Sequence, residues 1–207
     1  MDSLRQIRYI LRIMRVSADI AFKDWAVVVD ALGRGEQILI LRKGGIREQR
    51  GEFYVDHGLF WLFPTQYHEA ERSVITSKRP TLREIAAQAA PDTVDIQFYA
   101  AVERVLHLAN ASLLPRLQGR HILAEQILQQ RFEFGREPGL HAMLVRVYQL
   151  PRAERFPQRE SYGGCKSWVQ LERPVTGEVL PVLDDVEFAR QCNEITELIS
   201  DHACVTS

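Results

Sequence analysis

The chain has 207 residues, 46% of them hydrophobic, and its 26 basic and 27 acidic side chains nearly cancel. This length suits one ordinary globular domain or two small ones with a sizeable core, which excludes a disordered chain. The near-zero net charge excludes a uniformly basic surface, so any affinity for nucleic acid must come from a local patch.

The first patterned stretch covers residues 4–16. Arginines alternate there with aliphatic residues at roughly helical spacing, which predicts a basic amphipathic helix. Such a helix can bind a membrane surface, a targeting receptor or a partner protein, or it can dock on the body of the domain without a function of its own. We treat residues 1–20 as an N-terminal basic helix or extension.

Residues 25–41 have the composition of a β-hairpin. A valine-rich run at 25–31 and an apolar run at 37–41 flank a glycine-punctuated connector. A third apolar run covers residues 59–63 and ends at Pro64. The sequence therefore predicts three strands here, followed by a helix over 66–74.

The middle of the chain contains a capping pattern and the clearest strand pattern. Thr81, followed three residues later by Glu84, predicts a short helix over 82–89. Residues 94–102 alternate apolar and polar side chains with the period of a half-buried strand. This alternation is the strongest strand signal in the sequence.

The last third of the chain repeats both kinds of pattern. Leu123 and Ile127 indicate one apolar helical face, and residues 140–150 are strand-like. Asp184 and Asp185 open a terminal helix that reaches position 199. Together the elements predict an α+β fold, a curved mixed sheet or partly closed barrel with flanking helices. We place the α+β domain at 21–175 and a C-terminal helical segment at 176–207.

Cysteine usage and hydropathy indicate the compartment. The three cysteines are odd in number and lack the close pairing of a zinc site, which indicates free thiols in a reducing compartment. No run approaches the roughly 20 apolar residues of a membrane span, and the N-terminus lacks a signal-peptide pattern. We expect a cytoplasmic protein with no membrane span, no metal and no cofactor.

A cationic segment after the second predicted strand is the best candidate for ligand binding. Its four basic residues lie within nine positions, and its double glycine can bring backbone N–H groups against phosphate oxygens. Aromatic residues nearby can stack on bases. A solvated hairpin tip, with its charge partly offset by Glu48 and Glu52, gives the same pattern. The candidate ligand-binding residues are Arg42, Lys43, Gly44, Gly45, Arg47, Arg50, Trp61, Tyr67, His68, Tyr162 and Lys166.

A second set of residues has the chemistry of an enzyme site. His57 and His68 flank an aromatic segment, and each has the chemistry of a general base or a metal ligand. Cys165 lies in a glycine-rich turn beside Lys166, which can lower the pKa of a thiol. Structural roles account for the same residues: surface or core histidines, and a small buried side chain in a tight turn.

Five segments carry a resemblance to a known family: 41–46, 51–53, 60–68, 146–150 and 162–171. On these motifs the chain resembles a bacterial family known as a domain of unknown function, number eighteen hundred and two. The likeness covers residues 21–171. The family is sometimes joined to Mrr-type restriction endonuclease domains, which implies, by association, a role or a protein partner in restriction-modification or DNA defence.

A second resemblance concerns the fold. The strand patterns at 94–102 and 140–150, with the hairpin before them, are similar to those of small PUA-like barrels. That group includes RNA-binding and modified-base-reading domains, so the resemblance implies a partly closed PUA-like barrel.

Several common catalytic motifs are missing from the sequence. A nuclease of the Mrr type needs an Asp-x-Lys or Glu-x-Lys motif, and neither occurs. There is also no phosphate loop of the Walker type, no dinucleotide fingerprint and no nucleophile elbow. The leading hypothesis is therefore a non-catalytic module for nucleic acid or a phosphorylated ligand. An enzyme with an unfamiliar His/Cys site and a protein-interaction subunit remain the alternatives.

Overall fold

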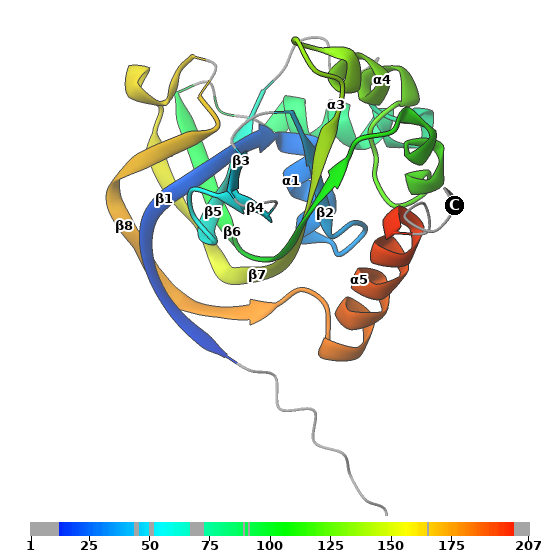
Figure 1. Cartoon of the computed structure of the whole chain (residues 1–207). Coiled ribbons are helices and arrows are strands. Elements are labelled where there is room, and N and C mark those ends of the chain that lie inside the picture. The colour runs from blue at the N-terminus through cyan, green and yellow to red at the C-terminus, as the bar shows by residue number, and fades with distance from the viewer. Residues whose placement is uncertain are drawn as a thin grey trace, which may run out of the picture.

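A computed structural model gives the structure of the chain and describes residues 13–43, 46–49, 52–66, 73–88, 90, 92–164 and 166–200. Eight strands and four α-helices are joined by short 3-10 turns within these residues (Figure 1). The strands are β1 (Met14–Trp25), β2 (Leu39–Arg42), β3 (Ile46–Gln49), β4 (Glu52–Val55), β5 (Leu59–Thr65), β6 (Thr93–Leu108), β7 (Leu140–Pro157) and β8 (Trp168–Pro181). The helices are α1 (Ala26–Gly33), α3 (Arg79–Gln88), α4 (Glu125–Glu133) and α5 (Asp185–Ser200), and the 3-10 turns are η1 (Thr76–Lys78), η2 (Ala111–Leu113), η3 (Pro115–Leu117) and η4 (Glu160–Tyr162).

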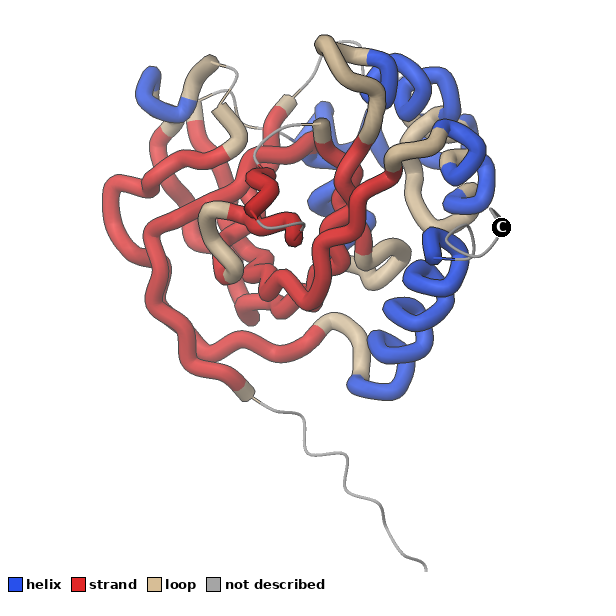
Figure 2. The backbone as a smooth tube through the Cα atoms, in the orientation of Figure 1, coloured by secondary structure: helices blue, strands red, loops and turns tan. Residues whose placement is uncertain are grey.

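The main sheet curls into a ring. Its six strands follow the order β2-β7-β6-β5-β1-β8, and an additional pairing of β7 with β8 closes five of them on themselves. That closure rests on two residue pairs, Tyr148 with Pro181 and Gln149 with Leu180. Figure 2 shows the curved wall of strands, with α4 and α5 at one side of it. The predicted α+β fold with a partly closed barrel is confirmed, although the ring is not a regular barrel.

Strand β6 explains how the sheet bends. It alternates buried and exposed residues at its start, as the sequence predicts, and it pairs with β7 along almost its whole length. The pairing shifts register between Ile96 and Phe98 and again between Val102 and Arg104. Such bulges bend a strand and increase its twist. With these two bulges, β6 continues to Leu108, six residues beyond the predicted end at residue 102.

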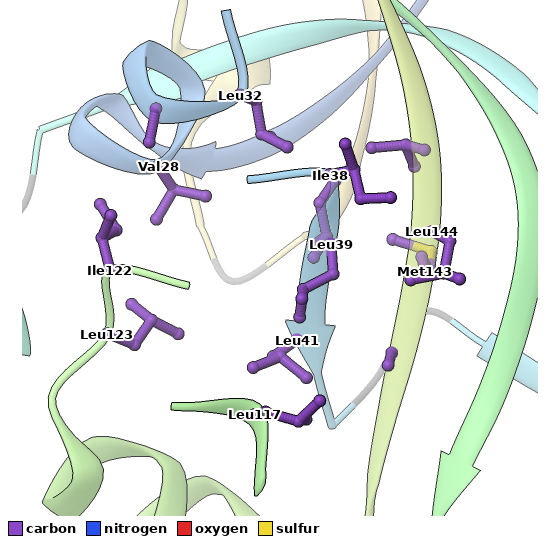
Figure 3. Close-up of a cluster of buried hydrophobic side chains, with 14 of the residues drawn as sticks. Val28, Leu32, Ile38, Leu39, Leu41, Leu117, Ile122, Leu123, Met143 and Leu144 are labelled. Atoms are coloured by element: carbon purple, nitrogen blue, oxygen red, sulfur yellow. The ribbon is translucent and has the colours of Figure 1, made fainter. Parts of the chain in front are cut away.

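Two hydrophobic clusters stabilise the domain. The larger one joins α1, β2 and β7 to the segment from η2 to α4 and to α5. Figure 3 shows part of it: Val28 of α1 lies near Ile122, and Leu39 of β2 lies beside its register partner Leu144 of β7. The smaller cluster packs β1, β5, β6, β7 and β8 around Trp61, Phe156 and Tyr162. The sheet therefore carries apolar packing on both faces.

The predicted hairpin at 25–41 is wrong, because Ala26–Gly33 forms the helix α1. Five of its eight residues are buried, and the helix packs against β1, β5, β7 and α3. A short apolar run has the same composition in a buried helix as in a buried strand. Burial on several sides therefore overrides the strand propensity of the three consecutive valines.

The predicted N-terminal helix is wrong where it is described. Residues 1–12 lie outside the described residues, but Met14–Trp25 is a strand whose first residues pair with β8. Strand β1 crosses the predicted boundary at residues 20 and 21, and β8 crosses the one at 175 and 176. Paired strands thus run through both boundaries, and the division of the chain into three parts stays a prediction.

The other helices occur where expected, with changed ends. Helix α3 begins at Arg79, so Thr81 lies inside it and does not cap it. Helix α4 is confirmed, with Leu128 and Phe132 buried; of the predicted apolar face, Leu123 is buried but precedes the helix, and Ile127 is half-buried. The helix predicted over 66–74 lies mostly outside the described residues.

Helix α5 has the predicted acidic start. Asp184 Oδ1 accepts a hydrogen bond from the Glu187 backbone N–H at 2.8 Å, which satisfies one of the N–H groups at the helix start. Cys192 lies buried in this helix as a free thiol, and burial raises its pKa. Within the described residues, no helix is long and apolar enough to cross a membrane.

The strands predicted at 59–63 and 140–150 are confirmed and are longer than expected. Strand β5 continues through Pro64, which was predicted to end it, and β7 continues beyond the predicted end at Leu150, through Pro151. A proline cannot donate a ladder hydrogen bond, but it fits the extended backbone at positions where no such bond is needed.

Candidate functional site

A cleft of about 580 Å³ opens where β1 and β5 end. The two strands run parallel, with Lys23 opposite Phe63 and Trp25 opposite Thr65, so their carboxyl ends meet at one edge of the sheet. Helix α1 begins there at Ala26, and α3, the start of β6, the end of β7 and η4 complete the wall. The volume lies in the range of small-molecule binding sites.

The cleft wall mixes amide, charged and apolar side chains. Gln66 follows β5, Gln97 lies in β6 and Gln158 follows β7. Gln97 Nε2 donates to the Leu150 carbonyl oxygen at 3.3 Å, whereas Gln66 and Gln158 are exposed. Each amide offers both donors and an acceptor. The other lining residues are Lys23, Ala26, Val29, Asp30, Leu62, Phe63, Pro64, Thr65, Ile85, Ala90, Thr93, Val94, Asp95, Phe98, Arg155, Tyr162 and Gly163.

A bulge in β6 brings an aromatic ring to the cleft. Because the register shifts between Ile96 and Phe98, the consecutive residues Gln97 and Phe98 both line it. The half-buried Phe98 ring lies directly over Gly33 of α1, where an added Cβ would meet the ring at 2.2 Å. Glycine at position 33 therefore permits the observed position of the ring.

Lys23 holds in place the turn after η4, which forms one side of the cleft. Its Nζ donates to the carbonyl oxygens of Tyr162 at 2.7 Å and of Gly164 at 2.9 Å. Gly164 has a φ of 73°, a conformation that glycine adopts readily. Hydrogen bonds from an ammonium group are stronger than those between neutral groups. The turn after η4 is thus held against the end of β1.

The cleft also contains a cross-strand ion pair. Asp95 of β6 and Arg155 of β7 are register partners. Arg155 donates to both carboxylate oxygens, from Nε at 2.7 Å and from Nη2 at 2.8 Å. The hydrogen bond from Arg155 lowers the pKa of Asp95 below its ordinary value of 3.8. Both charges are therefore present at neutral pH.

Arg42, from the predicted cationic segment, lies at the opposite face of β1. Its guanidinium carbon is 4.8 Å from the centre of the Phe22 ring, and Nη1 is 3.9 Å from Asp24 Oδ1. Successive side chains of a strand point to opposite faces, so these contacts lie across β1 from Lys23. Arg42 Nη2 also donates to Ser167 Oγ at 3.0 Å. Arg42 thus ties the end of β2 to the start of β8.

Lys43 is used in a similar way. Its Nζ donates to the carbonyl oxygens of Phe132 at 3.2 Å and of Gly139 at 2.9 Å, and also to that of Glu137. An ammonium group has three N–H donors, and three carbonyl oxygens accept from it here. Lys43 therefore fastens the connection between α4 and β7 to the end of β2.

The predicted aromatic contacts divide into two cases. Trp61 is fully buried, its Nε1 donates to the Ala18 carbonyl oxygen at 3.0 Å, and it does not line the cleft, so its contact with a ligand stays a prediction. Tyr162 is 2% exposed, and its hydroxyl accepts a hydrogen bond from the Glu172 backbone N–H at 3.1 Å. It nevertheless forms part of the cleft wall.

The structure locates only some of the remaining candidates. Lys166 is exposed, just beyond the turn that Lys23 holds. Gly44, Gly45, Arg50, Tyr67, His68 and Cys165, together with the side chain of Arg47, lie outside the described residues. Their predicted contacts with a ligand stay predictions.

The predicted His/Cys site can be placed at one residue only. The His57 ring packs edge-on against Trp168, with ring centroids 5.0 Å apart. The other two members are outside the described residues, so their convergence with His57 stays a prediction. Among the residues that the structure describes, no group of three or more histidine, cysteine, aspartate and glutamate side chains is placed to hold a metal ion.

A pair of histidines lies near Lys43. His107 and His141 are register partners in β6 and β7, with ring centroids 4.8 Å apart. Burial lowers the pKa of His141 to about 4, and the charges of His107 and Lys43 act in the same direction. His141 is therefore neutral at physiological pH.

The cleft residues that sequence reasoning missed differ in the signal they leave. Asp95 and Gln97 belong to the polar face of the alternation at 94–102, which could have identified them as outward-facing residues. Lys23 and Arg155 meet the cleft only because β1 pairs with β5 and β6 with β7. No local sequence pattern indicates that these two side chains line the same cleft.

The family comparison finds one match. The model of the family described as Domain of unknown function (DUF1802) matches residues 21–194, which includes every residue of the cleft wall. Among curated proteins, none matches the chain.

Solved structures of ASCH from Zymomonas mobilis are similar to this chain. The crystal structure of ASCH has 13% sequence identity and a TM-score of 0.42, and the match covers 87% of this chain and 95% of that chain. Two mutant forms of the same protein give TM-scores of 0.38 and 0.40 at 13% and 14% identity. They cover 85% and 84% of this chain and 97% and 95% of theirs.

Proposed function

The chain belongs to the family of the domain of unknown function DUF1802, and we propose that it is a non-catalytic module that binds single-stranded nucleic acid by holding an unpaired base in its cleft. The observation that supports this proposal is the composition of the cleft wall. Side-chain amides from three separate elements share it with the half-buried ring of Phe98.

The chemistry of a nucleobase matches this wall. Base edges present donors and acceptors side by side, and the amides of Gln66, Gln97 and Gln158 supply both kinds of group. Proteins that read single strands hydrogen-bond the exposed base edges and stack the bases on aromatic side chains. The Phe98 ring and the apolar residues around it offer such a surface. A paired base cannot enter a cleft of this kind without leaving its helix.

In this proposal, the cationic segment predicted from the sequence stabilises the fold around the cleft and does not itself bind the base. Because Arg42 and Lys43 hold backbone and side-chain acceptors of the fold, their role is to position the end of β2 and the segment that contains Ser167. Lys166 is exposed beside the turn at the edge of the cleft and is a candidate contact for the backbone of the strand. Direct contacts from Arg47 and Arg50 stay predictions.

Fluorescence anisotropy with labelled single-stranded DNA, single-stranded RNA and duplex DNA tests the proposal. The double variant Gln66→Ala, Gln158→Ala removes two exposed amides of the cleft. We expect single strands to bind it about 30-fold more weakly or worse, because two base-edge contacts of ~1–3 kcal/mol each are lost. The matched control is Gln126→Ala, Gln130→Ala, since both of these amides are exposed on α4, outside the cleft wall.

A steric variant provides an independent arm. Gly33→Ala places a methyl group where the Phe98 ring lies. The ring must move, so we expect weaker binding of single strands while the amides are unchanged. If the parent protein binds no single strand even at low salt, or if both double variants weaken binding equally, the proposal is wrong.

A link to restriction-modification, and a protein partner from such a system, stay predictions from the family resemblance. The rival hypothesis of an enzyme with a His/Cys site also stays a prediction. Binding to nucleic acid that leaves the strand chemically intact favours the non-catalytic module over this rival. Mass spectrometry of the recovered oligonucleotide measures that outcome.

A further inference from the structure

The ion pair between Asp95 and Arg155 is well ordered and at the same time exposed to solvent. It is bidentate, with N···O distances of 2.7 and 2.8 Å, so the guanidinium is held in one orientation. It is also open to water, because the side chains of Arg155 and Asp95 are 67% and 45% exposed. Exposed pairs contribute little to folding, since water and salt screen them. This pair can therefore separate without a large loss of stability.

The position of the pair suggests why it exists. Two other cross-strand or neighbouring ion pairs of the same kind lie close by in the chain, Arg159 with Glu172 and Arg173 with Glu154. Of these three pairs, only Asp95 and Arg155 belong to the wall of the cleft. The sheet therefore places the Arg155 guanidinium at the cleft, and an anionic ligand could replace Asp95 as its partner.

A phosphate group is the anion that suits this exchange. Its oxygens match the paired N–H groups of a guanidinium as a carboxylate does. The three amides and the Phe98 ring line the same cleft, so a ligand that joins a base to a phosphate can contact both. The carboxylate of Asp95 would then lose its partner and repel the same phosphate, which lowers affinity in the parent protein.

We propose that Arg155 binds a phosphate of the ligand in the cleft and that Asp95 competes with this phosphate for Arg155. The cleft then takes a phosphorylated nucleoside unit. This inference rests on the proposed function, because it assumes that the cleft holds a base. It adds the chemical class of the ligand and assigns a binding residue and a competing residue. It also predicts that substitutions of the two partners act in opposite directions.

Isothermal titration calorimetry tests the inference with three classes of probe: the four ribonucleosides, their 5′-monophosphates, and a short single-stranded oligonucleotide of each base. Parent protein should bind at least one monophosphate about tenfold more tightly than the matching nucleoside. Arg155→Ala should abolish that difference and lower the slope of log affinity against log salt for the oligonucleotide by about 0.7, the value for one phosphate contact to a single strand.

Asp95→Asn supplies the discriminating arm. It removes the competing charge but keeps a side chain of the same shape, so we expect the monophosphate and the oligonucleotide to bind about two- to fivefold more tightly, with the nucleoside unchanged. Arg173→Ala is the matched control, because it breaks a similarly exposed pair that does not line the cleft. Its binding should equal that of the parent.

The outcomes separate the two proposals. If nucleosides and oligonucleotides bind in the cleft but the 5′-phosphate adds nothing and Arg155→Ala binds like the parent, the inference is wrong and the proposed function stands. If Asp95→Asn weakens binding as Arg155→Ala does, the pair is structural and the inference is again wrong. If the parent protein binds none of the probes, both proposals fail.

Discussion

Two cationic regions lie on opposite faces of the end of β1, and they differ in what surrounds their charges. On one face, Arg42 and Lys43 donate to acceptors that belong to the fold, including three backbone carbonyl oxygens around Lys43. On the other face, Arg155 pairs with a single exposed carboxylate beside a cleft. The segment with Arg42 and Lys43 has the more conspicuous sequence pattern. In our proposal, however, it is Arg155 whose partner a ligand can replace.

The comparison teaches that local sequence does not determine whether a cation is available to a ligand. A backbone carbonyl oxygen cannot leave, because moving it disturbs the chain on both sides. An exposed carboxylate side chain can rotate away into water, where it is well solvated. The partner of a cation, and the freedom of that partner to move, therefore decide its role.

The largest expected effect is loss of stability when Lys43 is replaced by methionine, which keeps the apolar stem. The variant removes hydrogen bonds from a charged donor to three carbonyl oxygens, so we expect unfolding to become easier by about 2–4 kcal/mol. Urea unfolding measures this change. Lys166→Met, at an exposed position, should alter the free energy of unfolding by less than about 0.5 kcal/mol.

The Lys43 variant also tests whether the cationic segment after β2 binds nucleic acid directly. Below its unfolding transition, it should bind single-stranded nucleic acid as the parent does. A strong loss of binding with unchanged stability would return the functional role to the cationic segment after β2, as the sequence pattern predicts.

A smaller effect separates the two regions by pH. The pKa of His141 is about 4 in the folded protein, against an ordinary value of 6.5, because burial and the charges of His107 and Lys43 disfavour its protonated form. The unfolded chain therefore binds a proton between these values while the folded protein does not, and stability falls as pH drops from 6.5 toward about 4. The pair at the cleft contributes only at the acid end of this window, because the pKa of Asp95 is lowered from 3.8 and the stability it supplies is lost as pH falls below about 5.

Thermal unfolding between about pH 7.5 and pH 4.5 measures this dependence. His141→Gln should weaken this dependence without removing it, because burial also lowers the pKa of His121 to about 4. Lys43→Met should weaken it less, because only one of the charges that lower the pKa of His141 is gone. A histidine NMR titration provides the direct check: a His141 midpoint near 6.5 would contradict the expected burial.

The smallest expected effect is on stability when the exposed pair is broken. Arg155→Ala and Asp95→Asn should each change the melting temperature by no more than about 1 °C, because water replaces the lost partner. Differential scanning calorimetry of both variants tests this expectation. A large drop would show that the pair holds β6 to β7, and it would remove the distinction between an exchangeable charge and a structural one.

Sequence reasoning succeeded where a pattern repeats within one element. The alternation at 94–102 located β6, and the acidic pair at Asp184 and Asp185 located the start of α5. It failed at residues 25–41, where a run of valines gives no period to distinguish a buried helix from a buried strand. Packing of α1 against three strands and α3 made that choice.

The sequence also did not indicate which aromatic side chains line the cleft. Tyr162 was selected from the sequence and lines the cleft, whereas Trp61 was selected for its aromatic ring and is fully buried. Whether an aromatic residue in a strand faces the core or a cleft depends on the register of that strand, and a shift of one residue reverses it. The bulge at Phe98 is such a shift, and nothing in the local sequence indicates it.

Periodicity and capping act between residues a few positions apart, so the α+β class, the long strand β6 and the terminal helix can be predicted from the sequence. The parallel pairing of β1 with β5 and the contact of β7 with β8 depend on the folded chain, as does the cleft that Lys23, Gln66, Phe98 and Arg155 share. These meetings join residues far apart in the chain. They follow from which apolar faces can be buried together, a property of the whole fold that no short segment contains.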